Sequence, residues 1–182
     1  MDKKIMNKTN LIKFATPYYA EKDIMHNMWH IELVEKLANK ILETSNYNVN
    51  INHLTLATYF HGFIYSHEND IKAWLNEQGF PENEISKIIE ISYESQRVET
   101  PKSIEGKILH DAHLLEGGKA YTITKCLITG SLRGQSLTET IEYIETNIID
   151  KSKCYLPETI KMLNEANLFT KDFLRELKNG LV

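Results

Sequence analysis

Apolar residues recur along most of the chain at intervals of three and four, which is the spacing of α-helices that bury one face. The clearest stripe predicts a helix over residues 23–44 and includes a histidine. Its members are His30, Leu33, Val34, Leu37, Ala38 and Ile41. Further stripes predict helices over 11–19 (ending near Pro17), 52–66, 69–78, from Pro81 onwards, 103–115, 119–129, from Ser136 onwards, and from Pro157 to Gly180. No useful run alternates with the period of a strand, so we predict an all-α fold of about seven or eight irregularly packed helices.

Residues that start or stop helices support these boundaries. Gly79 and Pro81 are typical of one helix ending and the next beginning. Ser103 is a suitable N-cap for the helix that follows it. Ser136-Leu-Thr-Glu139 has the pattern of a capping box. Gly62 is different, because a glycine inside a helix costs about 1 kcal/mol relative to alanine. Its presence predicts either the close approach of another group or the loss of a former side chain.

Three polar side chains interrupt the apolar stripes of three different predicted helices. They are His30, His61 and Asp111. Burying each of them alone is costly, and a shared divalent cation would remove most of that cost. Imidazole nitrogens and a carboxylate are suitable ligands for a first-row metal. The alternative is that each is a core polar group hydrogen-bonded to a neighbour, and the pattern alone leaves both readings open.

The composition limits the classes of protein to which the chain can belong, but it does not indicate a function. At 182 residues the chain is expected to form one domain over 1–182, with residues 1–10 flexible. A net charge of −4 argues against a nucleic-acid polymer as partner. Cys126 and Cys154 form neither a disulfide framework nor a metal knuckle, and are expected to be buried apolar groups. The absence of a long apolar run predicts no membrane partner and a cytoplasmic location.

Three segments resemble the motifs of the HD superfamily of metal-dependent phosphohydrolases. They are His26-Asn27-x-x-His30-Ile31, Phe60-His61-Gly62 with Tyr65 and Glu68-Asn69 after it, and Asp111-Ala112-His113-Leu114-Leu115. The resemblance covers nearly the whole chain and implies a single HD-like helical bundle. It implies that His30 is the first metal ligand, that His61 is the histidine of the His-Asp pair, and that Asp111 is the last aspartate.

The chain also departs from this family's pattern. Gly62 stands where the family has the aspartate of the His-Asp pair, and His113 stands where a second aspartate is usual. There is no histidine between Glu68 and Leu109, where two-metal relatives carry further ligands. A single divalent metal (Mn, Fe, Ni, Zn or Mg) is therefore expected, if any binds. The candidates to replace the lost ligand are His26, His67 and His113. Restoring the acid by Gly62→Asp is expected to raise metal affinity.

The resemblance implies hydrolysis of a phosphate ester such as a nucleotide, by metal-assisted attack of water. Glu68 is the candidate general base, with a helix N-terminal charge as the plain alternative. Surface cations are candidates for binding the phosphate, or are simply solubilising. Those singled out are Lys102, Lys119 and Arg133, with Arg97 and Lys107 beside them. The competing hypothesis is an inactive HD-like domain that binds a ligand or a protein. Altered chemistry on the same fold and a homodimer also stay open.

Overall fold

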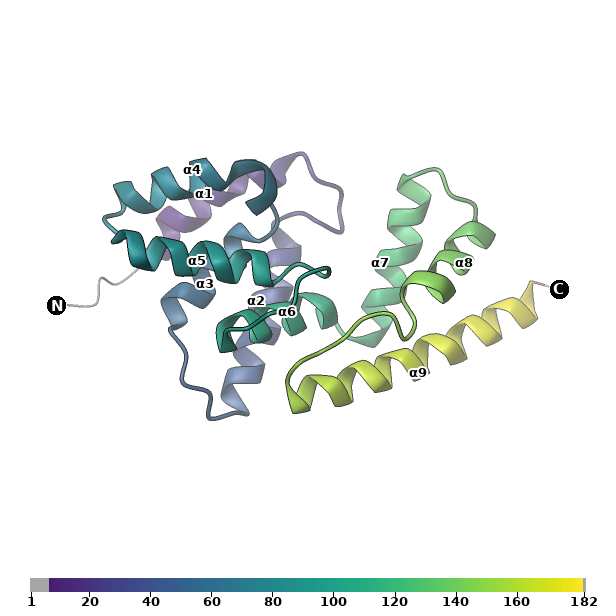
Figure 1. The fold of residues 1–182 in the computed structure, drawn as a ribbon. Coiled ribbons are helices and arrows are strands. Elements are labelled where there is room, and N and C mark those ends of the chain that lie inside the picture. Colours follow the sequence, from purple (N-terminus) through teal and green to yellow (C-terminus); the bar gives the residue numbers. More distant parts are fainter. Residues whose placement is uncertain (1–6, 182) are drawn as a thin grey trace. The chain divides into compact units, whose positions relative to one another are not determined.

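The computed structural model describes residues 7–181, and in these residues the regular secondary structure is entirely helical. The described part contains nine helices (Figure 1). They are α1 Lys8–Ala20, α2 Met28–Glu43, α3 Ile51–Phe60, α4 Ile64–Glu77, α5 Glu82–Glu94, α6 Ile104–Leu115, α7 Lys119–Leu132, α8 Leu137–Asn147 and α9 Pro157–Gly180. The predicted all-α fold is confirmed. The number of helices in the described residues is larger than the predicted seven or eight.

Contacts between residues sort the chain into two compact units, the first ending at His113 and the second beginning at Leu114. The sequence predicts one domain, which stays a prediction, and each unit is described by itself. Of the predicted flexible segment 1–10, residues 1–6 lie outside the described part. Lys8 to Asn10 form the first turn of α1, because the Asn7 side chain accepts hydrogen bonds from the backbone N–H groups of Thr9 and Asn10.

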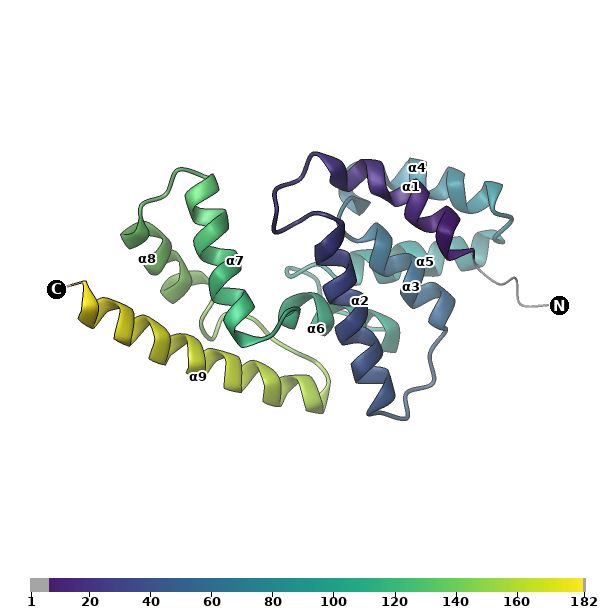
Figure 2. The ribbon, with the colours of Figure 1, turned by 180° about the vertical axis from the view of Figure 1, so that it is seen from behind.

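Helix α3 is the centre of the first unit. It packs against α1, α2 and α5, and α4 also packs on α5 (Figures 1 and 2). A helix that is apolar on nearly every side belongs in a core, and α3 is buried at Leu54, Leu56, Ala57 and Tyr59 as well as at Phe60. The Phe60 ring lies edge-on to Phe14 of α1 and to Trp74 of α4. This core fixes the end of α3, where His61 follows.

The helix predicted over 52–66 is two helices. The chain leaves helical structure at His61-Gly62-Phe63 and re-enters it at Ile64. Helix α4 then runs through the predicted gap before residue 69, with a kink at His67. Periodicity cannot detect this break, because both halves bury residues at the same spacing.

Two further helix boundaries differ from the prediction. Helix α1 continues through Pro17 to Ala20, with Pro17 exposed and Ala15 and Tyr19 buried on the opposite face. Burial of that face offsets the backbone hydrogen bond that proline removes. Helix α2 begins at Met28 rather than near Asp23, because the Asp23 carboxylate accepts from the Met25 backbone N–H and contacts the His26 ring, which makes a turn there.

In the second unit α7 packs against α8 and α9 around a small apolar cluster of Ile141, Ile144 and Leu174. Ser136 and Glu139 form the predicted capping box at the start of α8. Cys154 is buried, as expected, and Cys126 packs at the edge of the same cluster. Among residues 7–181, every helix is too short or too polar to cross a membrane.

Candidate metal centre

Three histidines from different parts of the first unit bring their rings together. His30 lies in the first turn of α2, His61 directly follows α3, and His113 lies in the last turn of α6. The Nε2 atoms of His30 and His61 are 3.2 Å apart. The ring centroid of His113 lies 5.3 Å from that of His30 and 4.6 Å from that of His61. Their ligand nitrogens all lie within 4.8 Å of one another. The predicted convergence of His30 and His61 is confirmed.

Backbone carbonyl groups orient two of these rings. The Nδ1 atom of His61 is 2.6 Å from the Thr58 carbonyl oxygen, and that of His113 is 3.1 Å from the Ser95 carbonyl oxygen. A carbonyl oxygen only accepts, so both Nδ1 atoms must carry the hydrogen. In a neutral imidazole the Nε2 atom then presents its lone pair. This is the hydrogen-bonding pattern that usually supports a metal-ligating histidine.

The spacing of the imidazoles fits a common cation. Two nitrogens bound to one zinc ion in tetrahedral geometry are about 3.3 Å apart, close to the 3.2 Å between His30 and His61. All the ligand nitrogens lie within 4.8 Å of one another, so the most widely spaced pair has to move closer, towards about 3.3 Å, before a tetrahedral zinc ion can bind all three. The donor set is three neutral nitrogens, two of them buried and one partly buried. Such a set suits zinc, iron or nickel better than magnesium.

Asp111 does not belong to this cluster, although it is fully buried on α6. Its Oδ1 atom is 3.2 Å from the Nδ1 atom of the adjacent His110, which is also buried. His53 in the first turn of α3 is also buried, with its Nε2 atom 3.4 Å from Glu84. Helices α3 and α6 therefore bury more than the single stripe that periodicity assigns to each of them.

The other two candidate replacement ligands are not part of the cluster of His30, His61 and His113. His26 is paired with Asp23 at 2.8 Å and His67 with Asp70 at 2.9 Å, and both side chains are partly exposed. Neither belongs to the group of three close ligand nitrogens. Of the three histidines proposed as substitutes, only His113 joins His30 and His61 in this group, although the centre of the His26 ring lies 6.0 Å from that of His30. The sequence singled out His113 by motif position, while helical spacing argued against it.

Glu68, the candidate general base, forms an ion pair with Lys72 and accepts a 2.5 Å hydrogen bond from the Tyr93 hydroxyl. These hydrogen bonds, that of Lys72 first, lower the pKa of Glu68 below its usual value. A carboxylate with a lowered pKa is a weaker base at neutral pH. Its assignment as the base stays a prediction.

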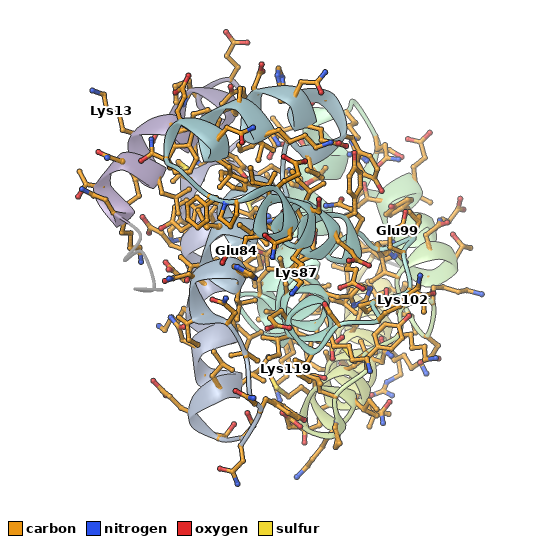
Figure 3. The ribbon with its side chains drawn as sticks, turned by 60° about the vertical axis from the view of Figure 1, so that its left-hand side comes forward. Lys13, Glu84, Lys87, Glu99, Lys102 and Lys119 are labelled. Atoms are coloured by element: carbon orange, nitrogen blue, oxygen red, sulfur yellow. The ribbon has the colours of Figure 1, made fainter. Side chains whose placement is uncertain are left out.

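The predicted phosphate-binding cations are divided between the two units. Lys102 and Glu99, both labelled in Figure 3, line a surface pocket of about 430 Å³ in the first unit together with Lys72 and Tyr93. In the second unit, the Lys119 ammonium lies 5.4 Å from the centre of the Phe169 ring. Arg133 is exposed at the end of α7. A role in phosphate binding stays a prediction for all three.

The position of Gly62 is explained by Tyr19. A Cβ atom built on Gly62 would lie 2.6 Å from both the Cε1 atom and the hydroxyl oxygen of Tyr19, which is 1% exposed. Of the two alternatives that the sequence left open for this glycine, the close approach of another group is confirmed. Gly62 itself lies in the turn between α3 and α4 and not inside a helix. Burial raises the pKa of the Tyr19 hydroxyl well above its ordinary value, so the group stays protonated and can donate.

No family model matches the chain, and no curated protein matches it either. Its fold is similar to several solved structures. Bacillus subtilis YpgQ in complex with ADP is 19% identical, with a TM-score of 0.73 over 93% of this chain and 97% of that one. The Lin1889 protein from Listeria innocua is 23% identical, with a TM-score of 0.70 over 97% and 98%. A Lactobacillus plantarum protein is 17% identical, with a TM-score of 0.76 over 97% and 98%. At these identities the likeness shows a shared all-helical fold.

Proposed function

We propose that this protein is a divergent member of the HD superfamily, a single-metal phosphohydrolase that acts on a phosphate ester of the nucleotide class. The observation that carries the proposal is the buried cluster of His30, His61 and His113, with the Nδ1 atoms of two of them held by backbone carbonyls. Similarity in fold to YpgQ, which was crystallised with ADP, supports a nucleotide as the ligand.

The residues of the chain have defined parts in this proposal. His30, His61 and His113 hold the cation through neutral nitrogens, and so leave its positive charge undiminished. A bound divalent cation polarises a phosphoryl oxygen and lowers the pKa of water. The apolar core around Phe60 fixes the end of α3, directly before His61. Glu68, if it acts as the base, must first lose the ion pair with Lys72.

The competing proposal is an inactive domain that keeps the scaffold and binds a ligand. The specific observation in its favour is Gly62, because the Tyr19 ring fills the place that the family's aspartate would occupy. A site without that acid is expected to bind metal less tightly and to position water less well. Metal binding and hydrolysis therefore have to be measured separately.

The test begins with protein purified without chelator and loaded in turn with Zn²⁺, Fe²⁺, Ni²⁺, Mn²⁺ or Mg²⁺. We expect one metal ion per chain and metal-dependent release of phosphate or pyrophosphate from nucleoside phosphates. His61→Ala should abolish both, and His67→Ala is the matched control because His67 lies outside the cluster. Stoichiometric metal and nucleotide binding without turnover would favour the inactive module. No metal with any of the five ions would contradict the proposed centre.

A further inference from the structure

The turn that carries His61 lies between two helices and is held by side chains from elsewhere in the unit. The Tyr19 hydroxyl donates to the Tyr59 carbonyl oxygen at 2.8 Å and accepts from the Gly62 backbone N–H at 3.2 Å. One hydroxyl thus connects Tyr59, two residues before His61 in the last turn of α3, to Gly62, the residue directly after His61. Because it contacts the backbone on both sides of His61, it limits how that residue can rotate.

Two further side chains hold the same backbone. The Lys22 ammonium donates to the Gly62 carbonyl oxygen at 2.5 Å, and its nitrogen lies 4.9 Å from the centre of the Tyr19 ring. The Gln96 amide donates to the His61 carbonyl oxygen at 2.9 Å. The His61-Gly62 segment is therefore fixed by hydrogen bonds from α1, from the loop after it, and from the loop after α5. Of these partners, only Tyr19 also occupies the space beside the Gly62 Cα atom.

We propose that Tyr19 is a positioning residue of the metal centre and that it is coupled to Gly62: its ring takes the space of a side chain at position 62, and its hydroxyl holds His61 in ligating orientation. The expected effect of Tyr19 on metal affinity rests on the proposed metal centre. Its effect on the orientation of His61 does not, and can be measured in the metal-free protein. The residues at positions 19 and 62 then depend on each other, because the Tyr19 ring leaves no space for a side chain at position 62. His113 supplies the third ligand of the proposed centre.

The main test removes only the Tyr19 hydroxyl. Tyr19→Phe keeps the ring in place, and its matched control is Tyr59→Phe, which removes a hydroxyl on α3 that contacts Glu35 instead. Partners that orient metal-ligating histidines typically change affinity by about 10- to 100-fold. We expect Tyr19→Phe to weaken Zn²⁺ affinity by at least about tenfold in competition with a chelator, and Tyr59→Phe to leave it unchanged. Equal affinities in the two variants would overturn the proposal.

A metal-free readout separates this inference from the proposed function. In nitrogen NMR spectra of the metal-free protein, Tyr19→Phe should shift the His61 ring resonances and accelerate hydrogen exchange at the Gly62 amide. These changes would uphold the positioning role even if no metal binds, in which case only the proposed function fails. If the wild-type protein binds metal while the His61 resonances and the Gly62 amide are unaffected by Tyr19→Phe, only the positioning role fails.

The coupling to Gly62 is tested by adding a side chain there. Gly62→Asp alone should lower the melting temperature and weaken metal binding, because its Cβ atom collides with the Tyr19 ring. This reverses the gain in affinity expected from the sequence alone. In Tyr19→Ala/Gly62→Asp the collision is removed, so the double variant should bind metal more tightly than Gly62→Asp. Neighbouring residues that share space show such non-additive effects. Strictly additive effects would contradict the coupling.

Discussion

The Nε2 atoms of His30 and His61 lie 3.2 Å apart in the core, although 31 positions separate the two residues in sequence. At that distance at least one of the two atoms must be without a hydrogen, since two N–H groups cannot point at each other. The Nδ1 atom of His61 donates to Thr58, so the lone pair belongs most simply to the Nε2 atom of His61. In the metal-free protein the Nε2 atom of His30 can donate a hydrogen bond to the Nε2 atom of His61. A cation between the two nitrogens can take the place of the shared hydrogen.

The first prediction concerns the third ligand. We expect His113→Ala to weaken Zn²⁺ binding by more than about 100-fold, because it removes one nitrogen of three, a larger change than the loss of an orienting partner. His67→Ala is the control, since its ring pairs with Asp70 and lies outside the cluster. Metal content after dialysis and titration with a coloured chelator give the affinities. Full occupancy in His113→Ala would mean that the metal is held without His113.

The second prediction concerns Asp111, which the HD resemblance includes among the metal ligands and the observed histidine cluster does not. The resemblance implies a metal ligand, whereas the carboxylate is fully buried beside His110 and outside the group of three nitrogens. We expect Asp111→Asn to reduce the free energy of unfolding by about 1–3 kcal/mol, because a buried charged hydrogen bond is lost. Metal affinity should change less than it does in His113→Ala. The opposite ranking would identify Asp111 as the ligand.

These residues show which members of the candidate site could be predicted from the sequence and which could not. His30 and His61 could be found because each lies on an apolar stripe, where an imidazole needs a partner. His113 could not be found by periodicity, because α6 is buried at adjacent positions, as Leu109, His110 and Asp111 show. A helix buried on several sides has no single stripe from which a ligand's direction could be inferred.

The break after α3 was missed for a related reason. Gly62 signalled that something unusual occurs there, but Tyr19 is far away in sequence, and no local pattern connects the two residues. The contact between Tyr19 and Gly62 becomes visible only when α1 is placed against α3. Helix caps were easier to predict, since a serine and the residue three positions later interact within one turn.

The third prediction uses pH. The folded-state pKa of Glu68 is lowered by hydrogen bonds from Lys72 and Tyr93. Its stabilising contribution is therefore fully present above its ordinary pKa and is lost as the pH falls through the lowered value. Tyr93→Phe removes one of these hydrogen bonds, so it should destabilise the protein at pH 7 and much less at pH 3. Urea unfolding at both pH values measures the difference.

A control variant separates Glu68 from other acids that titrate in the same range. In the Glu68→Gln background the Tyr93→Phe substitution should have the same effect at pH 7 and at pH 3. If the pH dependence persists there, the hydrogen bond to Tyr93 is not its source. The hydrogen bond to Glu68 and, after it, burial raise the pKa of Tyr93 to about 12, so this hydroxyl does not titrate in the experiment.

The fourth prediction concerns the start of α6, the helix that carries His113. The Ser103 hydroxyl accepts from the Gly106 backbone N–H at 2.9 Å and donates to Glu94, a buried carboxylate that also accepts from the backbone N–H groups of Lys102 and Ser103. Ser103→Ala removes the cap, which costs about 1 kcal/mol, and one donor to a buried charge, which costs about 1.5–3 kcal/mol. Ser136→Ala is the matched control, since it removes an exposed cap on α8.

We therefore expect Ser103→Ala to lower the free energy of unfolding by about 2–4 kcal/mol, and Ser136→Ala by about 1 kcal/mol. Both tryptophans, Trp29 and Trp74, belong to the first unit, so their fluorescence during urea unfolding follows the part of the chain that contains Ser103. Ser136 lies in the second unit, so its variant is followed by the loss of helical circular dichroism in the same titration. Because α6 positions His113, Ser103→Ala should also weaken metal binding, whereas Ser136→Ala should not. Equal destabilisation by the two substitutions would show that Glu94 gains nothing from the Ser103 hydroxyl.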